Sequence, residues 1–224
     1  MASQKTQPEL RPESEPRNDH PDVSARPDTA IDGPTHKSAL AADRMRQSLT
    51  DSPAPFAAAV YRPKAGDRKA VARFVDSLKR SNFRVGGILQ EKVYLGDSGM
   101  RRVDAINIAT GQRISINKPT SENWRNRVCS LDVSALAATA AILRGAIEDQ
   151  VDLIIVEKFG DEEREGKGLI DEILQGIASG IPLLIAVPET NLDAWTKRSG
   201  GMGDVLPFDE EAFDDWWALL KGKG

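Results

Sequence analysis

The sequence is poor in the residues that carry most enzyme chemistry. It contains two histidines, His20 and His36, and both precede the first strand pattern, which begins near residue 55. The folded part therefore has no histidine, which excludes a Ser-His-Asp triad, a Cys-His dyad, an HExxH zinc site and a histidine base unless the tail folds back into a site. Any catalysis must use carboxylates, lysine, arginine or a bound metal.

Cysteine and long apolar runs are equally scarce. Cys129 is the single cysteine, so the chain can form no internal disulfide and no cysteine-rich zinc site. The longest apolar run, at 181–188, is far too short to cross a bilayer, and the first ten residues contain no apolar signal-peptide region. We therefore expect a cytoplasmic protein that does not bind membranes.

The chain also lacks a basic surface signature. Its formal net charge is −4, and acidic and basic residues are interspersed throughout the folded part. Its tryptophans and tyrosines form no stacking series beside lysine and arginine. These absences argue against a nucleic-acid partner, since such proteins normally carry a basic patch.

Proline is concentrated at the N-terminus. Seven of the 13 prolines fall within residues 1–54, where few large apolar side chains are available to bury. This composition predicts a disordered tail over 1–54, followed by a single domain over 55–224. Within the tail, residues 36–51 have enough alanine, leucine, methionine and arginine to form a short helix on a protein partner. The alternative is a solubilising tail.

The rest of the chain alternates between strand and helix patterns. Four apolar runs predict buried strands: 55–61, 84–90, 151–156 and 181–187. Amphipathic helices are predicted from Asp67, over 131–149 with Asp132 as N-cap, and over 169–179. Between 91 and 116, turn signals predict a small antiparallel meander. The pattern indicates an α/β fold with a mostly parallel sheet flanked by helices.

Two local features refine this picture. Gly86 and Gly87 interrupt an apolar run, which predicts close packing or a bulge at that strand. A final helix carries Trp216 and Trp217. These two side chains either serve contacts with a partner or divide between the core and its rim.

The segment RPKAG (62–66) lies where a phosphate-binding loop is expected, between the first strand and its helix. Such a loop and the helix N-terminus cradle an anion with free backbone N–H groups. The Walker pattern GxxxxGK[ST] does not fit. With Gly66 as the second glycine, Asp67 takes the lysine slot, and a shift of one residue puts Arg68 there but leaves both glycine slots without glycine.

The cradle nevertheless keeps cations and one glycine. We interpret this segment as a degenerate anion site in which backbone N–H groups and basic side chains replace the standard loop. Its candidate ligand-binding residues are Arg62, Lys64, Gly66, Asp67, Arg68 and Lys69.

A second candidate group follows the apolar run that ends at Val156. Ligands of open parallel sheets bind at the carboxyl ends of the strands, and an acid at this point orients magnesium in nucleotide hydrolases. Glu157 is that acid, and Lys158 and Gly160 complete the predicted contacts. The alternative is that Glu157 and Lys158 open a solvated charged loop. No cofactor is identified, and Mg²⁺ is expected only if a nucleotide binds.

The order of GGILQEKV, RRVDAINIATGQRISI, LIIVEKFGDEE and LLIAVPETN resembles the thermophile and cancer-related nucleoside-triphosphatase family of P-loop fold. The resemblance implies that Glu157 replaces the metal-orienting aspartate and that Lys158 replaces the presumed catalytic glutamate of an Asp-Glu-Ile-Gly motif. The loss of that glutamate and of the Gly-Lys-Ser/Thr core argues against hydrolysis.

Five further motifs resemble an uncharacterised bacterial family whose members are often encoded beside molybdate-transport genes. They read AAVYRPKAGD, VGGILQ, CSLDVSAL, LIIVEKFGDEEREGKGL and AVPETNLDAWTKRSGG. The resemblance implies a link to molybdenum metabolism by gene context alone and brings no biochemical activity with it. The strand-loop-helix frame with its cations indicates an accessory or regulatory protein that binds a nucleotide or an oxyanion. Two alternatives stay open: an active nucleoside-triphosphatase or other carboxylate and lysine enzyme using Glu157, and a non-catalytic interaction module.

Overall fold

The computed structural model describes residues 55–62, 69–96, 99–126 and 132–222. The proline-rich tail, most of the predicted phosphate loop (Lys64, Gly66, Asp67 and Arg68) and Cys129 lie outside these ranges. Within the described ranges, no helix combines the length and the apolar character needed to cross a membrane.

Seven strands form one sheet in the order β4-β3-β2-β5-β6-β1-β7. The strands are β1 (Phe56–Tyr61), β2 (Val85–Tyr94), β3 (Arg101–Asn107), β4 (Arg113–Ser115), β5 (Leu153–Glu157), β6 (Leu183–Pro188) and β7 (Asp204–Pro207). β2, β5, β6, β1 and β7 run parallel, whereas β3 and β4 pair antiparallel at one edge. The predicted mostly parallel sheet with a small antiparallel meander is confirmed.

The meander differs from the prediction in one respect. Residues 84–90 and the first meander strand were expected to be separate elements, but β2 runs without a break over ten residues. Its first half pairs with β5 and its second half pairs only with β3. The meander is therefore built on an extension of a central strand.

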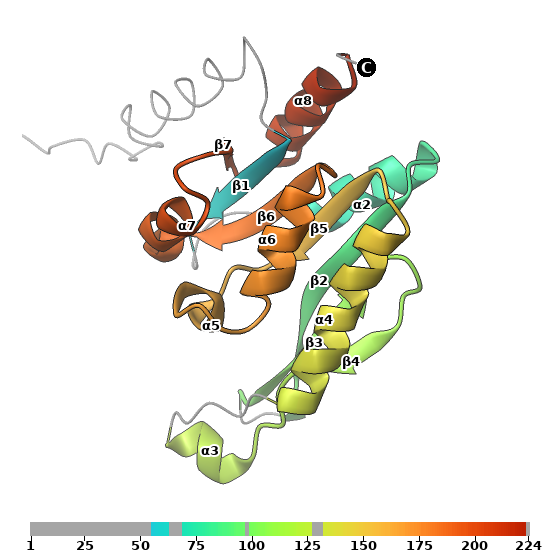
Figure 1. The fold of residues 1–224 in the computed structure, drawn as a ribbon. Helices are drawn as coiled ribbons and strands as arrows, with labels where there is room; N and C mark the ends of the chain where they lie inside the picture. The colour runs from blue at the N-terminus through green and yellow to red at the C-terminus, as the bar shows by residue number, and fades with distance from the viewer. Residues whose placement is uncertain (1–54, 63–68, 97–98, 127–131, 223–224) are drawn as a thin grey trace, which may run out of the picture. The chain divides into compact units, whose positions relative to one another are not determined.

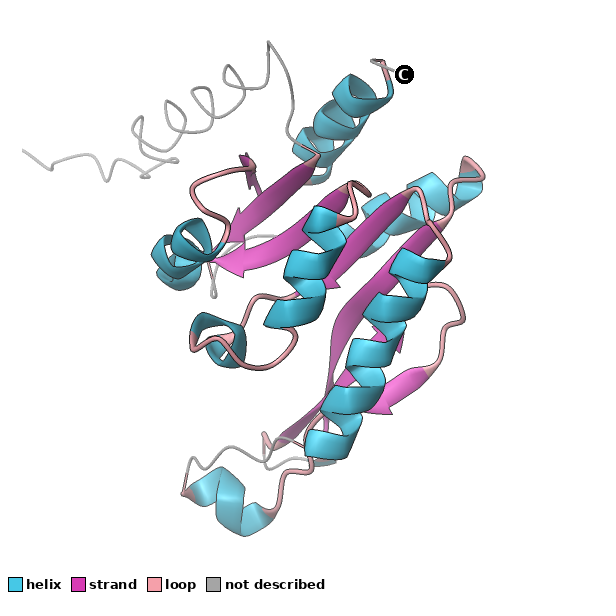
Figure 2. Ribbon diagram, in the orientation of Figure 1, coloured by secondary structure: helices cyan, strands magenta, loops and turns pink. Residues whose placement is uncertain are grey.

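Helices cover both faces of the sheet (Figure 1; Figure 2). α2 (Ala70–Arg80) and α8 (Glu210–Lys221) pack on one face, where their apolar side chains join those of β1 and β5. α4 (Val133–Glu148), α6 (Ile170–Ala178) and α7 (Leu192–Arg198) contribute to the cluster on the other face. Three short elements were not predicted: α3 (Ser121–Arg125), α5 (Asp161–Arg164) and the 3₁₀ turn η2 (Glu189–Asn191).

The long helices form for the reasons that their sequences indicate. In α2 the apolar side chains of Val71, Phe74, Val75 and Leu78, which recur at helical spacing, are all buried. Asp67, from which this helix was predicted to run, lies outside the described residues. In α4 the side chain of Asp132 accepts hydrogen bonds from the N–H groups of Ser134 and Ala135, which confirms the predicted N-cap.

The two tryptophans of α8 belong to the core. Trp216 is fully buried and Trp217 is 6% exposed, and the ring of Trp217 meets that of Phe83 edge-on at 5.2 Å. The interpretation that either side chain serves contacts with a partner was wrong, because β1, β5, α2 and α8 together bury both rings. This removes one of the two features on which a protein-interaction role rested.

A buried carboxylate fixes the meander. Asp104 of β3 accepts a forked pair of hydrogen bonds from Arg102 at 2.8 and 3.0 Å, and a third from the Ser115 hydroxyl at 2.8 Å. The hydrogen bond from Arg102 holds the pKa of Asp104 below its ordinary value, with a smaller effect from Ser115. This carboxylate therefore ties β3 to β4.

We expect Asp104→Asn to lower the free energy of unfolding at neutral pH by about 1–2 kcal/mol, because it removes charge-assisted hydrogen bonds. Since the folded-state pKa is depressed, the contribution is fully present above the unfolded-state pKa of about 3.9 and is lost as pH falls through the lower folded value. Urea titrations of both proteins at neutral and acidic pH measure this. A stability gap that does not narrow in acid would contradict it.

Candidate functional site

The candidate site lies at the edge where the parallel strands end. Residue pairing sets Tyr61 of β1 beside Pro188 of β6, and Glu157 of β5 beside Ala186 of β6. Because the three strands are parallel neighbours, the residues that follow them meet at one edge of the sheet. Arg62, Glu157 and Lys158 therefore all lie at this edge of the sheet. That they form one binding site stays a prediction.

Glu157 is held inside the sheet and does not extend into solvent. It is the last residue of β5, it is 6% exposed, and its Oε2 accepts a hydrogen bond from the Gln90 N–H at 3.1 Å. Strand alternation places it on the side of Leu153 and Ile155, the face that α2 and α8 cover. The alternative of a solvated charged loop is wrong for this residue. A buried carboxylate at a strand end has its orientation fixed before any ligand arrives.

The carboxylates at this edge limit how the protein could hold the Mg²⁺ that the fold family implies. Among the described residues, no group of three or more His, Cys, Asp or Glu side chains could hold a metal ion. Mg²⁺ keeps several waters and binds through one or two carboxylates together with substrate phosphates. A single buried Glu157 therefore fits a Mg²⁺ that arrives with a phosphate, and it does not fit a metal cage built from protein alone.

A forked ion pair crosses the mouth of the site. Arg62, which follows β1, donates from Nε to Glu189 Oε2 at 3.0 Å and from Nη2 to Oε1 at 3.3 Å. Both side chains are more than half exposed. Glu189 was not among the predicted site residues. Its position directly after a buried apolar run is the same signal that pointed to Glu157.

The loop after β5 is closed by a carboxylate that the sequence analysis missed. Glu163 of α5 is 7% exposed, and its two oxygens accept hydrogen bonds from the N–H groups of Gly160 at 2.8 Å and Leu169 at 3.0 Å. Glu163 thereby joins the start of the loop to the start of α6. The N–H of Gly160, a predicted ligand contact, is already engaged by this carboxylate.

The remaining predicted contacts surround α2. Lys69 is exposed and occupies the N-cap position of that helix, with no capping hydrogen bond from its side chain. Lys64, Gly66, Asp67 and Arg68 belong to the segment between β1 and α2 that lies outside the described residues. Their part in the site stays a prediction.

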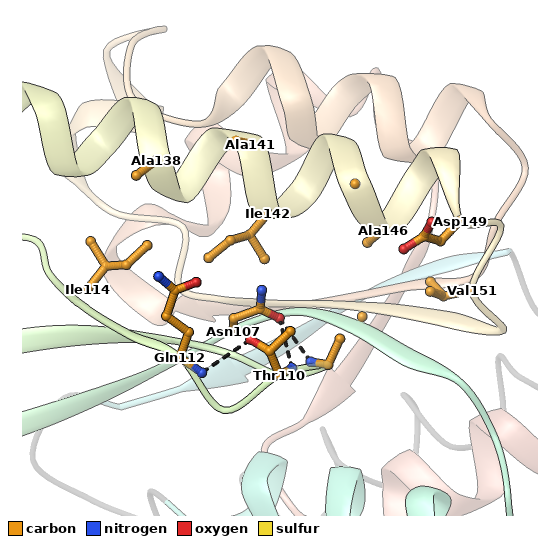
Figure 3. A pocket seen from close by; sticks show the side chains of 13 residues that line it. Asn107, Thr110, Gln112, Ile114, Ala138, Ala141, Ile142, Ala146, Asp149 and Val151 are labelled. Atoms are coloured by element: carbon orange, nitrogen blue, oxygen red, sulfur yellow. Dashed lines mark hydrogen bonds between the residues drawn. The ribbon is translucent and has the colours of Figure 1, made fainter.

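A hollow of 380 Å³ lies at the other end of the sheet, between α4 and the turn that joins β3 to β4. Figure 3 shows Asn107, Thr110 and Gln112 of this turn below Ala138 and Ala141 of the helix. Oδ1 of Asn107 accepts hydrogen bonds from the N–H groups of Ala109 and Thr110, so its carbonyl shapes the turn. None of the predicted site residues lines this hollow, which separates it from the candidate site.

Comparison with known families assigns the chain. A family profile described as "Protein of unknown function (DUF2478)" matches residues 56–216. The chain belongs to the DUF2478 family. This match covers the whole sheet and the first half of α8, so the family assignment applies to the fold that carries the candidate site.

Two curated relatives resemble this DUF2478 protein in sequence. Nucleoside-triphosphatase THEP1 of Methanothermobacter thermautotrophicus is 32% identical over 142 residues, which are 61% of this chain and 78% of THEP1. The molybdenum import ATP-binding protein ModC 2 of Bradyrhizobium diazoefficiens is 37% identical over 165 residues, 74% of this chain. The chain spans only 18% of the length of ModC 2, so the match concerns a part of that protein.

Two solved structures share the fold. A human cancer-related nucleoside triphosphatase superposes with a TM-score of 0.55 at 16% identity, and 77% of this chain covers all of that protein. THEP1 from Aquifex aeolicus superposes with a TM-score of 0.52 at 17% identity, with 71% of this chain covering 92% of that one. The predicted P-loop-NTPase-like fold and the resemblance to the thermophile and cancer-related family are both confirmed.

Proposed function

We propose that this DUF2478 protein binds a phosphorylated nucleotide or a tetrahedral oxyanion at the carboxyl edge of β1, β6 and β5. The observation that carries the proposal is the buried Glu157, fixed at the end of β5 on the same face of the sheet as α2. The P-loop-like fold of its relatives supports the same location. In such folds a phosphate sits against the helix N-terminus that follows the first strand.

The charges at this edge divide into two roles. Glu157 would hold a Mg²⁺ that bridges to a phosphate, and a bound Mg²⁺ would neutralise the phosphate charge that Glu157 and Asp67 otherwise repel. Arg62, Lys64, Arg68, Lys69 and Lys158 would supply the cations around the anion. Gly66 would let the backbone approach the anion closely.

The residue that follows Glu157 argues against hydrolysis at the proposed site. The position after Glu157 is Lys158, whereas phosphoryl transfer to water needs a group that orients or deprotonates the nucleophile. An ammonium group serves neither purpose and instead adds positive charge for a bound anion. We therefore propose an accessory or regulatory role in which binding, without hydrolysis, is the function.

The similarity to ModC 2 supports a choice of ligands to test. That protein is named for molybdenum import, and the segment of it that resembles this chain makes up 18% of its length. Molybdate and tungstate are tetrahedral dianions that a cradle of backbone N–H groups and arginine side chains can hold. We propose them beside the nucleotides as ligands of the same edge, in an accessory step of molybdenum metabolism.

A thermal-shift screen of the full chain tests the proposal. The ligands are ATP, GTP and their diphosphates with and without Mg²⁺, then molybdate, tungstate and sulfate, with phosphate release measured in parallel. A true ligand at one hundred times its dissociation constant should stabilise the fold by about 2.7 kcal/mol. A flat response to all of them at millimolar concentration, with folded protein, would overturn the proposal.

The Arg62 to Glu189 pair gives a mutational prediction. Glu189→Gln removes the carboxylate that engages Arg62 and lowers the negative charge at the mouth, so we expect anion affinity to rise about two- to fivefold, as befits an exposed ion pair. Arg62→Gln, the matched control, should lower the affinity. Titration with the best ligand of the screen measures both. Unchanged anion affinity in both variants would show that Arg62 does not contact the bound anion.

A further inference from the structure

A cavity of 260 Å³ lies on the opposite face of the sheet from Glu157, beside the same strand end. It is lined by residues of the β2–β3 pair, the N-terminal half of α4 and the loop after β5. Its apolar lining comes from Ile88, Val103, Leu136 and Leu169. Ile88 and Leu169 belong to the core cluster beneath α4 and α6, so the cavity opens from the core of that face.

Two hydrogen-bond donors that line this cavity have no recorded partner among the described residues. Lys158 is half-buried, and within the described residues the structure records no hydrogen bond or ion pair for its ammonium group. The side-chain amide of Gln90 is half-buried too and has no recorded partner in that part of the chain, since only its backbone N–H is engaged, by Glu157. Half-buried donors beside apolar side chains lose hydration, so an acceptor between them would be bound favourably.

The acids around the cavity limit the charge of its ligand. Glu163 already accepts two backbone hydrogen bonds, and Asp161 pairs with Arg164 at 3.6 Å. Glu162, which also lines the cavity, is left to oppose a second negative charge on a ligand. The cavity, at 260 Å³, also lies just below the roughly 300–1,000 Å³ typical of sites for drug-sized ligands. A nucleoside triphosphate fits neither the charge nor the size.

We propose that this cavity binds a small organic monoanion, namely a monocarboxylate with a compact apolar body. The carboxylate accepts hydrogen bonds from Lys158 and Gln90, and the apolar body lies against Ile88, Val103 and Leu136. The site shares Lys158 with the proposed nucleotide or oxyanion site, but it lies on the opposite face of the sheet and is argued from its own lining residues. Because Lys158 follows Glu157 directly, occupancy of the cavity fixes the residue next to the proposed metal ligand.

The test is a ligand-observed NMR titration of the full chain with benzoate, its neutral counterpart benzamide, and the multivalent anion citrate. We expect saturable benzoate binding with a millimolar dissociation constant. Loss of one charge-assisted interaction weakens binding by about tenfold or more, so benzamide should bind at least that much more weakly. Citrate should not compete. Equal binding of benzoate and benzamide, or no saturation by benzoate, would overturn the proposal.

Three variants locate the site. Lys158→Met keeps the length of the side chain but removes its charge, and it should weaken benzoate about tenfold or more. Val103→Phe fills the cavity and should block benzoate while leaving any nucleotide or molybdate response intact, which separates this proposal from the proposed function. Lys167→Met removes an exposed ammonium group from the same loop and should change nothing. Benzoate affinity that survives both Lys158→Met and Val103→Phe would contradict the assignment.

Discussion

Replacing Gly87 with alanine should lower the free energy of unfolding by about 4 kcal/mol or more, or prevent folding altogether. Gly87 lies in β2 with φ of +101°, a backbone conformation that residues with a side chain rarely adopt. A Cβ atom at this position would lie 2.1 Å from the carbonyl oxygen of Ile155 in β5. Neither strand can yield, because both are buried at the centre of the sheet.

A second glycine provides the control for this prediction. Gly145 lies in the last turn of α4, and a Cβ atom built on it meets nothing within 4 Å. Gly145→Ala should therefore raise the free energy of unfolding by about 0.4–1 kcal/mol through helix propensity and a less flexible unfolded chain. Urea denaturation of both variants measures the contrast. A Gly87→Ala variant as stable as the wild type would show that β2 and β5 do not approach each other as described.

Glu163→Ala is the substitution with the second largest expected effect, and it should lower the free energy of unfolding by about 3 kcal/mol. The substitution removes two hydrogen bonds to a buried carboxylate and leaves the N–H groups of Gly160 and Leu169 without their acceptors. A buried donor without an acceptor costs about 1–3 kcal/mol, and hydrogen bonds to charged groups contribute more than neutral ones. The loop after β5 should lose its closed form first, because Glu163 is the side chain that joins its two ends.

Two variants bracket this result in urea denaturation and amide hydrogen exchange. Glu163→Gln retains one carbonyl acceptor and should fall between the wild type and Glu163→Ala. Glu165→Ala removes an exposed carboxylate of the same loop and should change stability by less than about 0.5 kcal/mol. If the hydrogen-exchange protection of the Leu169 amide and of the other loop amides is unchanged in Glu163→Ala, the structural role of this carboxylate is contradicted.

The parts of the fold that follow from periodicity could be predicted from the sequence. The stripe of α2, the N-cap Asp132 and the four buried strands all rest on local patterns, and the structure confirms them. Gly86 and Gly87 were expected to mark close packing or a bulge. A Cβ on Gly86 would lie 2.6 Å from that of Ala146 in α4, so close packing is confirmed at both positions.

The parts that the sequence did not reveal depend on contacts between distant segments. The pairing of Arg62 with Glu189 joins residues 127 positions apart, and no local pattern records it. Glu163 stands in a run of charges, where a solvated surface is the ordinary interpretation. Its burial follows from the way that the loop folds back onto α6. Both tryptophans of α8 are buried for a similar reason, since the face that covers them comes from α2 and β5.

The candidate site was predicted in part. The position of Glu157 followed from the end of an apolar run, because parallel strands end at a common edge. The orientation of its side chain did not, since it depends on the Gln90 N–H of a neighbouring strand. The cavity beside Lys158 was also beyond the sequence, because it is formed by β2, β3, α4 and the loop after β5 together.

The most direct test of the central claim is a calorimetric titration of the full chain with the best anionic ligand of the screen, with and without Mg²⁺, in the wild type and in Glu157→Gln. Glutamine keeps the shape of the side chain and an acceptor for the Gln90 N–H, but it removes the charge. Asp161→Asn, an exposed carboxylate of the following loop, is the matched control.

We predict that Mg²⁺ raises the affinity of the wild type and of Asp161→Asn by about tenfold or more, and that Glu157→Gln loses this gain while retaining the weak affinity seen without metal. The melting temperature of the variant without ligand should match that of the wild type. A gain from Mg²⁺ that is undiminished in Glu157→Gln would contradict the account, because the carboxylate at the end of β5 would then not hold the metal.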